Sequence, residues 1–268
     1  MSMRMPNKSA AENNLAKISQ PLFTRLGTLL LIVGIVVVFF ISQLIGVYIA
    51  GKLVLPTAKS ATVGDIFFFG SNDGTVVSLS IIIGCVLLMA ISALIVRMRG
   101  GNFTQYLVLK PFSLATGMGM IGLLLIFMIG SQALTYMLDE TPLSFVDPLY
   151  QSVSSVWLLI FAMVIVAPIY EELIFRGLLW SAIAEQFSSP SDLLLRSEHR
   201  GAIVASLVTS FIFAGIHLQY GIYEISTIVV LALIFCYARI KSGSLILPML
   251  LHIINNGAAM WQYLAQVA

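Results

Sequence analysis

Two adjacent glutamates and an arginine, Glu171, Glu172 and Arg176, lie in the middle of a long apolar stretch of the chain. An ionisable side chain at the centre of a bilayer costs at least ~2.5–3.5 kcal/mol, so such residues usually face partners inside the protein and serve its function. Glu172 and Arg176 are four residues apart, with the acid first, a spacing that pairs opposite charges on one face of a helix. Because Glu171 lies about 100° around that helix, the two carboxylates are not expected to share one role.

Two later apolar stretches also contain a histidine that has a notable partner four residues away. Phe213 and His217 form one such pair, and His252 and Asn256 form another. Residues four apart lie on the same face of a helix. The first pair therefore places an aromatic ring beside an imidazole, and the second presents two hydrogen-bonding groups on one face.

The heights of these residues along their helices can be compared through the polar loop 188–201. Glu171 precedes the loop and His217 follows it by similar distances, so at a rise of 1.5 Å per residue both stand roughly 24–26 Å from it. His252 and Asn256 fall at a broadly similar level in the last apolar stretch. We therefore predict that these four side chains surround one site.

Two prolines precede these positions, Pro168 before Glu171 and Pro248 before His252. Proline has no backbone N–H and tends to kink a helix. The carbonyl group that loses its donor in this way needs another partner, such as a side chain or a water molecule. We expect such a partner close to each proline.

The composition places these residues in a membrane protein. The chain is 59% hydrophobic and 10% charged, against about 45–50% and 25% in soluble domains. A membrane-spanning helix needs about 17–25 apolar residues. We predict an all-α polytopic membrane protein with about seven transmembrane helices, the last four forming the core of the site, at residues 27–51, 76–96, 115–137, 151–187, 202–222, 223–240 and 245–266. The segment 53–75 is expected at the membrane interface, although an eighth crossing there stays open.

The basic residues indicate an orientation. With seven spans and the N-terminus inside, eleven Lys and Arg residues fall in the inside segments and two fall outside, as the positive-inside rule requires of a cytoplasmic N-terminus. We predict a cytoplasmic tail at 1–25 and a single transmembrane domain at 26–268, in the cytoplasmic membrane. The basic residues do not form one patch, so no nucleic-acid partner is expected.

Three motifs together resemble those of a known family. The motifs EExxxR from Glu171, FxxxH from Phe213 and HxxxN from His252, in this order, resemble the signature of the CAAX-protease and bacteriocin-immunity (CPBP, or Abi) intramembrane proteases. These are related to the type II CAAX prenyl endopeptidases. The segment 238–244 also resembles that family, and the resemblance covers about residues 150–262, with the protease core expected at 150–266.

The resemblance implies an intramembrane endopeptidase that acts on a peptide or membrane-protein substrate within the lipid bilayer. By this resemblance, Glu171 and His217 would bind and activate the hydrolytic water, and His252 and Asn256 would stabilise the tetrahedral oxyanion. The residues with supporting roles would be Glu172, Arg176 and Phe213. Amide hydrolysis does need a positioned base and hydrogen-bond donors aimed at the developing oxyanion.

Other interpretations of the same residues stay open at this point. No cofactor is expected to be required, but zinc or another divalent metal could bind to Glu171, His217 and His252. Against zinc, the chain contains no HExxH motif, a common zinc-binding arrangement on a helix. Chains of Glu and His also relay protons in transporters, so a proton-coupled transporter is one alternative. A non-catalytic immunity or scaffold protein of the membrane is another.

Overall fold

The computed structural model describes residues 21–55, 60–140, 144–187 and 196–267, and this part of the chain is helical without a strand. The all-α prediction is confirmed. The long helices are α2 (Arg25–Val54), α4 (Gly74–Met98), α6 (Leu114–Leu138), α11 (Arg196–Gly215), α12 (Ile222–Ser242) and α13 (Ile246–Val267). Another long helix is continuous from Val156 to Glu185 and consists of successive α-helical and π-helical segments. These are α8 (Val156–Ile160), η2 (Phe161–Val166), α9 (Ala167–Glu172), η3 (Leu173–Leu179) and α10 (Trp180–Glu185). Short helices connect them, α3 (Val63–Gly70), α5 (Phe103–Tyr106), η1 (Ser144–Val146) and α7 (Asp147–Ser152).

Among the described residues, five helices are long and apolar enough to cross a membrane, namely α2, α4, α6, the continuous helix α8–α10, and α12. The other two predicted spans correspond to α11 and α13. The apolar part of α11 is short, from His199 to Gly215, and α13 is interrupted by polar side chains. Of the predicted cytoplasmic tail at 1–25, residues 1–20 lie outside the described part of the chain. The protein is a multi-pass membrane protein.

One predicted boundary was wrong in a way that matters for the site. The fifth span was expected to continue to residue 222, but α11 ends at Gly215. The backbone then tightens, because the amide of His217 donates to Ala214, only three residues back. His217 therefore lies in the connection after the helix rather than on its face.

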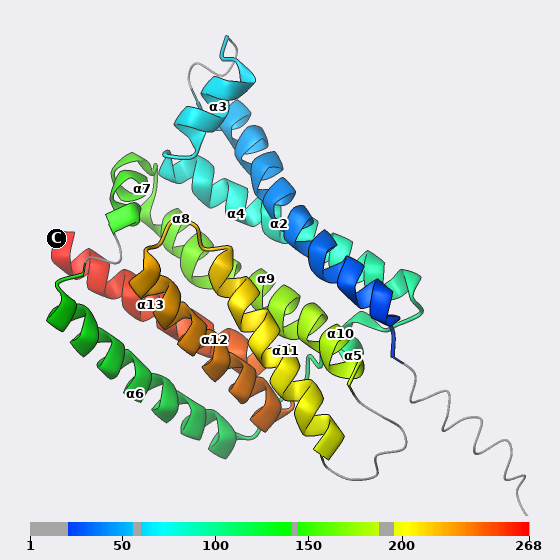
Figure 1. The fold of residues 1–268 in the computed structure, drawn as a ribbon. Helices are drawn as coiled ribbons and strands as arrows, with labels where there is room; N and C mark the ends of the chain where they lie inside the picture. Colours follow the sequence, from blue (N-terminus) through cyan, green and yellow to red (C-terminus); the bar gives the residue numbers. More distant parts are fainter. Residues whose placement is uncertain (1–20, 56–59, 141–143, 188–195, 268) are drawn as a thin grey trace, which may run out of the picture.

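The helix α8–α10 occupies the centre of the bundle (Figure 1). Its apolar core is 61% buried, against 17–33% for the other four candidate spans. The pair α2 and α4 packs on one side of it, α11 and α13 pack on the other, and α6 lies outermost against α12 and α13. Neighbouring helices thus shield the central helix from lipid, so it can carry charged side chains.

Polar residues define where the helices begin, and small residues allow two of them to approach closely. The side chains of Thr24, Asp73 and Ser113 accept backbone hydrogen bonds at the starts of α2, α4 and α6, as N-cap residues do. At the contact between α2 and α4, a Cβ atom on Gly46 would lie 2.7 Å from the carbonyl oxygen of Ser80. A larger residue would separate the two helices there.

The segment predicted to be too short to cross the membrane forms the eight-residue helix α3. A capping box starts it, since Thr62 and Asp65 each bond the other's backbone N–H. The hydrogen bonds from Thr62 hold the pKa of the Asp65 carboxyl below its ordinary value. Phe68 and Phe69 are exposed on this helix, which supports the expected interfacial position.

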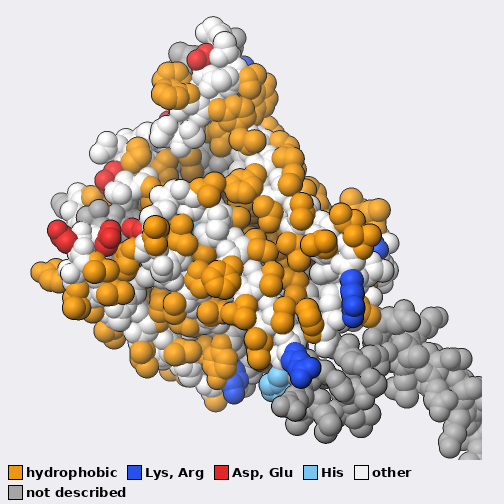
Figure 2. All heavy atoms as spheres, in the orientation of Figure 1, with side chains coloured by type: hydrophobic (Ala, Val, Ile, Leu, Met, Phe, Trp, Pro, Cys, Tyr) orange, Lys and Arg blue, Asp and Glu red, His pale blue; other side chains and the backbone are white. Residues whose placement is uncertain are grey.

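The surface shows an apolar belt with opposite charges at its two ends. In Figure 2, hydrophobic side chains cover the flanks of the helices, while Lys and Arg gather at one end and Asp and Glu at the other. Exposed apolar area of this extent is normal for a surface that faces lipid rather than water. The bilayer is therefore one partner of this protein.

Candidate active site

Glu171 and Glu172 end the helix α9, between the two π-helical segments η2 and η3. In η2 the hydrogen bonds join residues five apart, and the amide of Ala167 donates to the carbonyl of Ala162. The next residue, Pro168, has no N–H with which to continue this pattern. The carbonyl of Met163 thereby loses its helical donor. Such π-helical turns frequently occur at functional sites.

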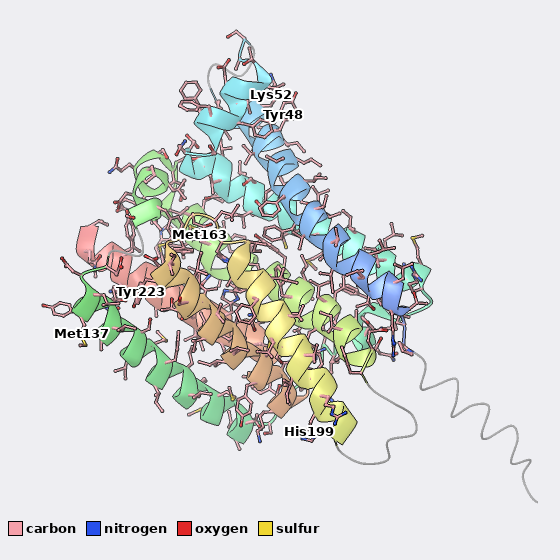
Figure 3. The ribbon with its side chains drawn as sticks, in the orientation of Figure 1. Tyr48, Lys52, Met137, Met163, His199 and Tyr223 are labelled. Carbon is pink, nitrogen blue, oxygen red and sulfur yellow. The ribbon has the colours of Figure 1, made fainter. Side chains whose placement is uncertain are left out.

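Asn256 supplies the missing donor from the neighbouring helix α13. Its Nδ2 donates to the carbonyl of Met163 at 3.1 Å; Met163 is labelled in Figure 3. This confirms the expectation that a side chain would serve the carbonyl left free by Pro168. Pro248 differs, because it lies in the first turn of α13, where a missing N–H breaks no helical bond.

Replacement of Asn256 by alanine is expected to lower the free energy of unfolding by about 1–3 kcal/mol, the cost of leaving an enclosed acceptor unpaired. The matched control is Asn255→Ala, which removes only the longer 3.4 Å bond from Asn255 Nδ2 to Asn256 Oδ1. Denaturant unfolding in detergent micelles measures both variants. Equal stability losses would contradict the assignment of the Met163 contact to Asn256.

A buried network of charges joins the central helix to α13. Oε1 of Glu172 accepts a bond from Nη1 of Arg176 at 2.9 Å and lies 2.9 Å from Nδ1 of His252. The side chains of Glu172 and Arg176 are both 0% exposed. The ion pair expected from their spacing is therefore present, and His252 joins it as a third member.

Aromatic rings surround the guanidinium of Arg176. Its Cζ atom lies 4.2 Å from the ring centre of Phe213 and 5.5 Å from that of Phe235. A cation over a desolvated aromatic face is attracted by the negative face of the ring. Phe213 also packs against His217, with ring centres 4.7 Å apart, so it walls the imidazole as predicted.

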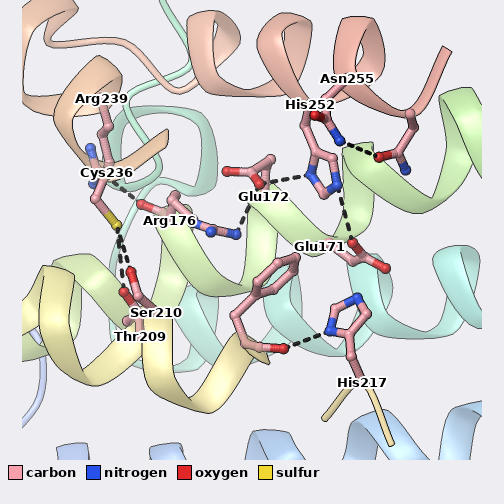
Figure 4. Close-up of polar contacts among 12 residues, drawn as sticks. Glu171, Glu172, Arg176, Thr209, Ser210, His217, Cys236, Arg239, His252 and Asn255 are labelled. Carbon is pink, nitrogen blue, oxygen red and sulfur yellow. Dashed lines mark hydrogen bonds and ion pairs between the residues drawn. The ribbon is translucent and has the colours of Figure 1, made fainter. Parts of the chain in front are cut away.

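Glu171 approaches the same histidine from the other side of its ring. Oε2 of Glu171 lies 3.7 Å from Nε2 of His252, whereas Glu172 contacts Nδ1. The two carboxylates do face different directions, yet one imidazole lies between them. Figure 4 shows the carboxylate of Glu171 between the rings of His252 and His217.

The hydrogen bond of His217 determines which of its nitrogens carries a proton. Nδ1 lies 2.7 Å from the carbonyl oxygen of Phe213. A carbonyl oxygen only accepts, so Nδ1 must donate. In the neutral ring Nε2 then carries a lone pair and can accept a hydrogen bond from water.

The structure brings the predicted residues to one place. Glu171, His217, His252 and Asn256 all line a single cavity of about 720 Å³, as their similar heights predicted. Asn255, the neighbour of Asn256 on α13, lines this cavity too.

The residues around the site that sequence reasoning missed are held by contacts between distant parts of the chain. Nε2 of Gln43 donates to the hydroxyl of Tyr170 at 3.2 Å, and both residues line the cavity. Gln43 stands out in the sequence as a polar residue inside the first span, but nothing there identifies its partner. Arg239 is one of the eleven basic residues assigned above to the inside segments. It is buried in the structure, and it donates to the carbonyl of Arg176 and to Ser181.

The described residues contain no group of three or more His, Cys, Asp or Glu side chains arranged to hold a metal ion. The set named above as possible zinc ligands, Glu171, His217 and His252, therefore does not form such a group. The Nδ1 atoms of both histidines are engaged, by Phe213 and by Glu172, so only their Nε2 atoms could coordinate a metal.

Comparison with known proteins gives two partial matches. Residues 153–258 match the family described as type II CAAX prenyl endopeptidase Rce1-like. An uncharacterized 24.3 kDa protein of Escherichia coli is 31% identical over 103 residues, which is 38% of this chain and 42% of that protein. No solved structure matches the chain. The matched segment carries all three motifs, so this part of the chain is similar to the Rce1-like CAAX-protease family.

Proposed function

We propose that this protein is an intramembrane endopeptidase that hydrolyses a peptide bond in a peptide or membrane-protein substrate. One observation carries the proposal: Glu171, His217, His252 and Asn256 line one cavity inside a helical bundle. The family match over residues 153–258 supports a peptidase, while the roles of the individual residues rest on their geometry.

In the proposed first step, Glu171 and His217 hold a water molecule against the scissile carbonyl. The water donates one hydrogen bond to Nε2 of His217 and gives its other proton to the carboxylate of Glu171 as its oxygen attacks the carbonyl carbon. A positioned base typically contributes ~10²–10⁴-fold to the rate. The proton held by Glu171 then passes to the amide nitrogen, the C–N bond breaks, and an amine leaves.

His252 and Asn256 are proposed to stabilise the oxyanion that forms in this step. Nδ1 of His252 is occupied by Glu172, so donation from Nε2 requires a proton on each ring nitrogen. The positive charge of such an imidazolium balances the negative charge of Glu171, just as Arg176 balances Glu172. Asn256 uses one N–H on Met163 and retains a second, and each oxyanion donor is typically worth ~2.7–4 kcal/mol.

The location and orientation predicted from the sequence are part of this proposal. The protein is placed in the cytoplasmic membrane with its N-terminus in the cytoplasm, its partners being the lipid bilayer and the substrate. No metal or other cofactor is required by the proposed mechanism.

Purified protein in detergent is expected to cleave members of a peptide and membrane-protein panel, and to keep this activity in EDTA or 1,10-phenanthroline. Mass spectrometry of the products identifies the cleaved bond. Loss of activity in chelator with recovery on adding zinc would replace the metal-free mechanism with a metal-dependent one. Proton-coupled transport in liposomes without hydrolysis would instead favour a transporter, and neither activity would favour an immunity or scaffold protein.

A further inference from the structure

The described lining of the cavity reaches only one end of the bundle. Besides helix side chains, it is lined by residues of three connections: α3 to α4, the segment before α8, and α11 to α12. All three connections lie at the same end of the helices. The connections at the other end, 99–113 and 243–245, contribute no residue to the lining. Ser71 and Gln219 are among the lining residues at the open end, the one that the lining reaches.

Tight packing closes the other end below the site. Phe175, Arg176 and Leu178 are almost completely buried there. Next to them, a Cβ atom on Gly177 would collide with Leu107, and it would lie 3.1 Å from Leu245. Side chains from three different segments thus fill the space between the cavity and that end of the bundle.

The two ends differ in charge. The closed end carries six described basic residues against one acid, Glu185: Arg25, Arg97, Arg99, Lys110, Arg200 and Lys241. The open end carries six described acidic residues against one cation, Lys52: Asp65, Asp73, Asp139, Glu140, Asp147 and Glu224. Lys52 and His199 mark the two ends in Figure 3, and Figure 2 shows the same separation of charge on one face. By the positive-inside rule, the basic end is cytoplasmic.

We infer that the substrate reaches the site from the non-cytoplasmic side of the membrane. The substrate class is then a peptide, or a segment of a membrane protein, that is exposed on that side. Among the described residues, the cavity lining offers no route from the cytoplasmic end to Glu171. The cleavage part of this inference rests on the proposed function, but the direction of access follows from the cavity and the charges alone.

Thiol labelling tests the direction of access without any enzyme assay. The two native cysteines are first removed as Cys85→Ala and Cys236→Ala. Ser71→Cys and Gln219→Cys then place one thiol each at the open end, and Lys241→Cys places one at the basic end. In intact bacterial spheroplasts, a membrane-impermeant maleimide is expected to label the first two, and to label Lys241→Cys only after permeabilisation. The reverse pattern would overturn the inference.

A second measurement distinguishes an error in the inferred side of substrate access from an error in the proposed peptidase activity. Proteoliposomes are prepared with the open end outward, as confirmed by labelling of Gln219→Cys, and an impermeant peptide that the detergent-solubilised protein cleaves is added outside. Cleavage is expected in these vesicles and not in vesicles of the opposite orientation. Cleavage only in the opposite orientation would overturn the inferred route. If the solubilised protein cleaves nothing, the proposed function fails, and the labelling result alone decides the route.

Discussion

Glu171→Gln is expected to slow peptide hydrolysis by orders of magnitude while leaving the protein folded. Glutamine has the same shape as glutamate, and the contact of Glu171 with His252 is a 3.7 Å approach rather than a short hydrogen bond. The amide cannot accept the proton of the attacking water, so the general base is lost. The expected decrease in kcat/KM is ~10²–10⁴-fold, the usual contribution of such a base.

The measurement is kcat/KM on a peptide that the wild-type protein cleaves, together with the thermal unfolding midpoint in detergent. Glu224→Gln is a suitable control, because Glu224 lies in α12 outside the cavity lined by Glu171. The control should retain wild-type activity. Undiminished activity of Glu171→Gln, at unchanged stability, would remove Glu171 from the proposed mechanism.

Helical periodicity in the sequence predicted much of this site. It fixes the direction of each side chain around its helix axis and the height of that side chain along the axis. The spacing of Glu172 and Arg176 gave their pairing, and residue counts from one loop gave similar heights for Glu171 and His217. The missing amide of Pro168 also predicted an unsatisfied carbonyl. These are properties of single helices, so they could be derived without knowing how the helices pack.

The remaining features depend on how each helix is rotated against its neighbours. The bridging position of His252 between the two carboxylates requires α13 to present that ring to the central helix. Burial of Arg239 depends on its contact with the carbonyl of Arg176, and no local pattern encodes this. The early end of α11 moved His217 off the helix face, although its bond to Phe213 preserved the predicted pairing.

Arg176→Met is expected to be the most destabilising of the substitutions considered, by about 3–5 kcal/mol, the usual cost of removing one partner of a buried ion pair. Methionine fills much of the same space between Phe213 and Phe235 but leaves Glu172 as a carboxylate that is 0% exposed. Only His252 then remains to balance it. Denaturant unfolding in micelles measures the loss.

The double variant Glu172→Gln/Arg176→Met distinguishes stability from catalysis. Removing both charges should recover most of the lost stability, because a neutral pair avoids the unpaired buried charge. The fold does not need an ion at this position, since the amide oxygen introduced by Glu172→Gln can still accept the bond from Nδ1 of His252. That oxygen does not stabilise an imidazolium as a carboxylate does, so kcat should stay low in a protein that folds. A double variant as unstable as Arg176→Met would show that the arginine supports the fold through its aromatic contacts rather than through its charge.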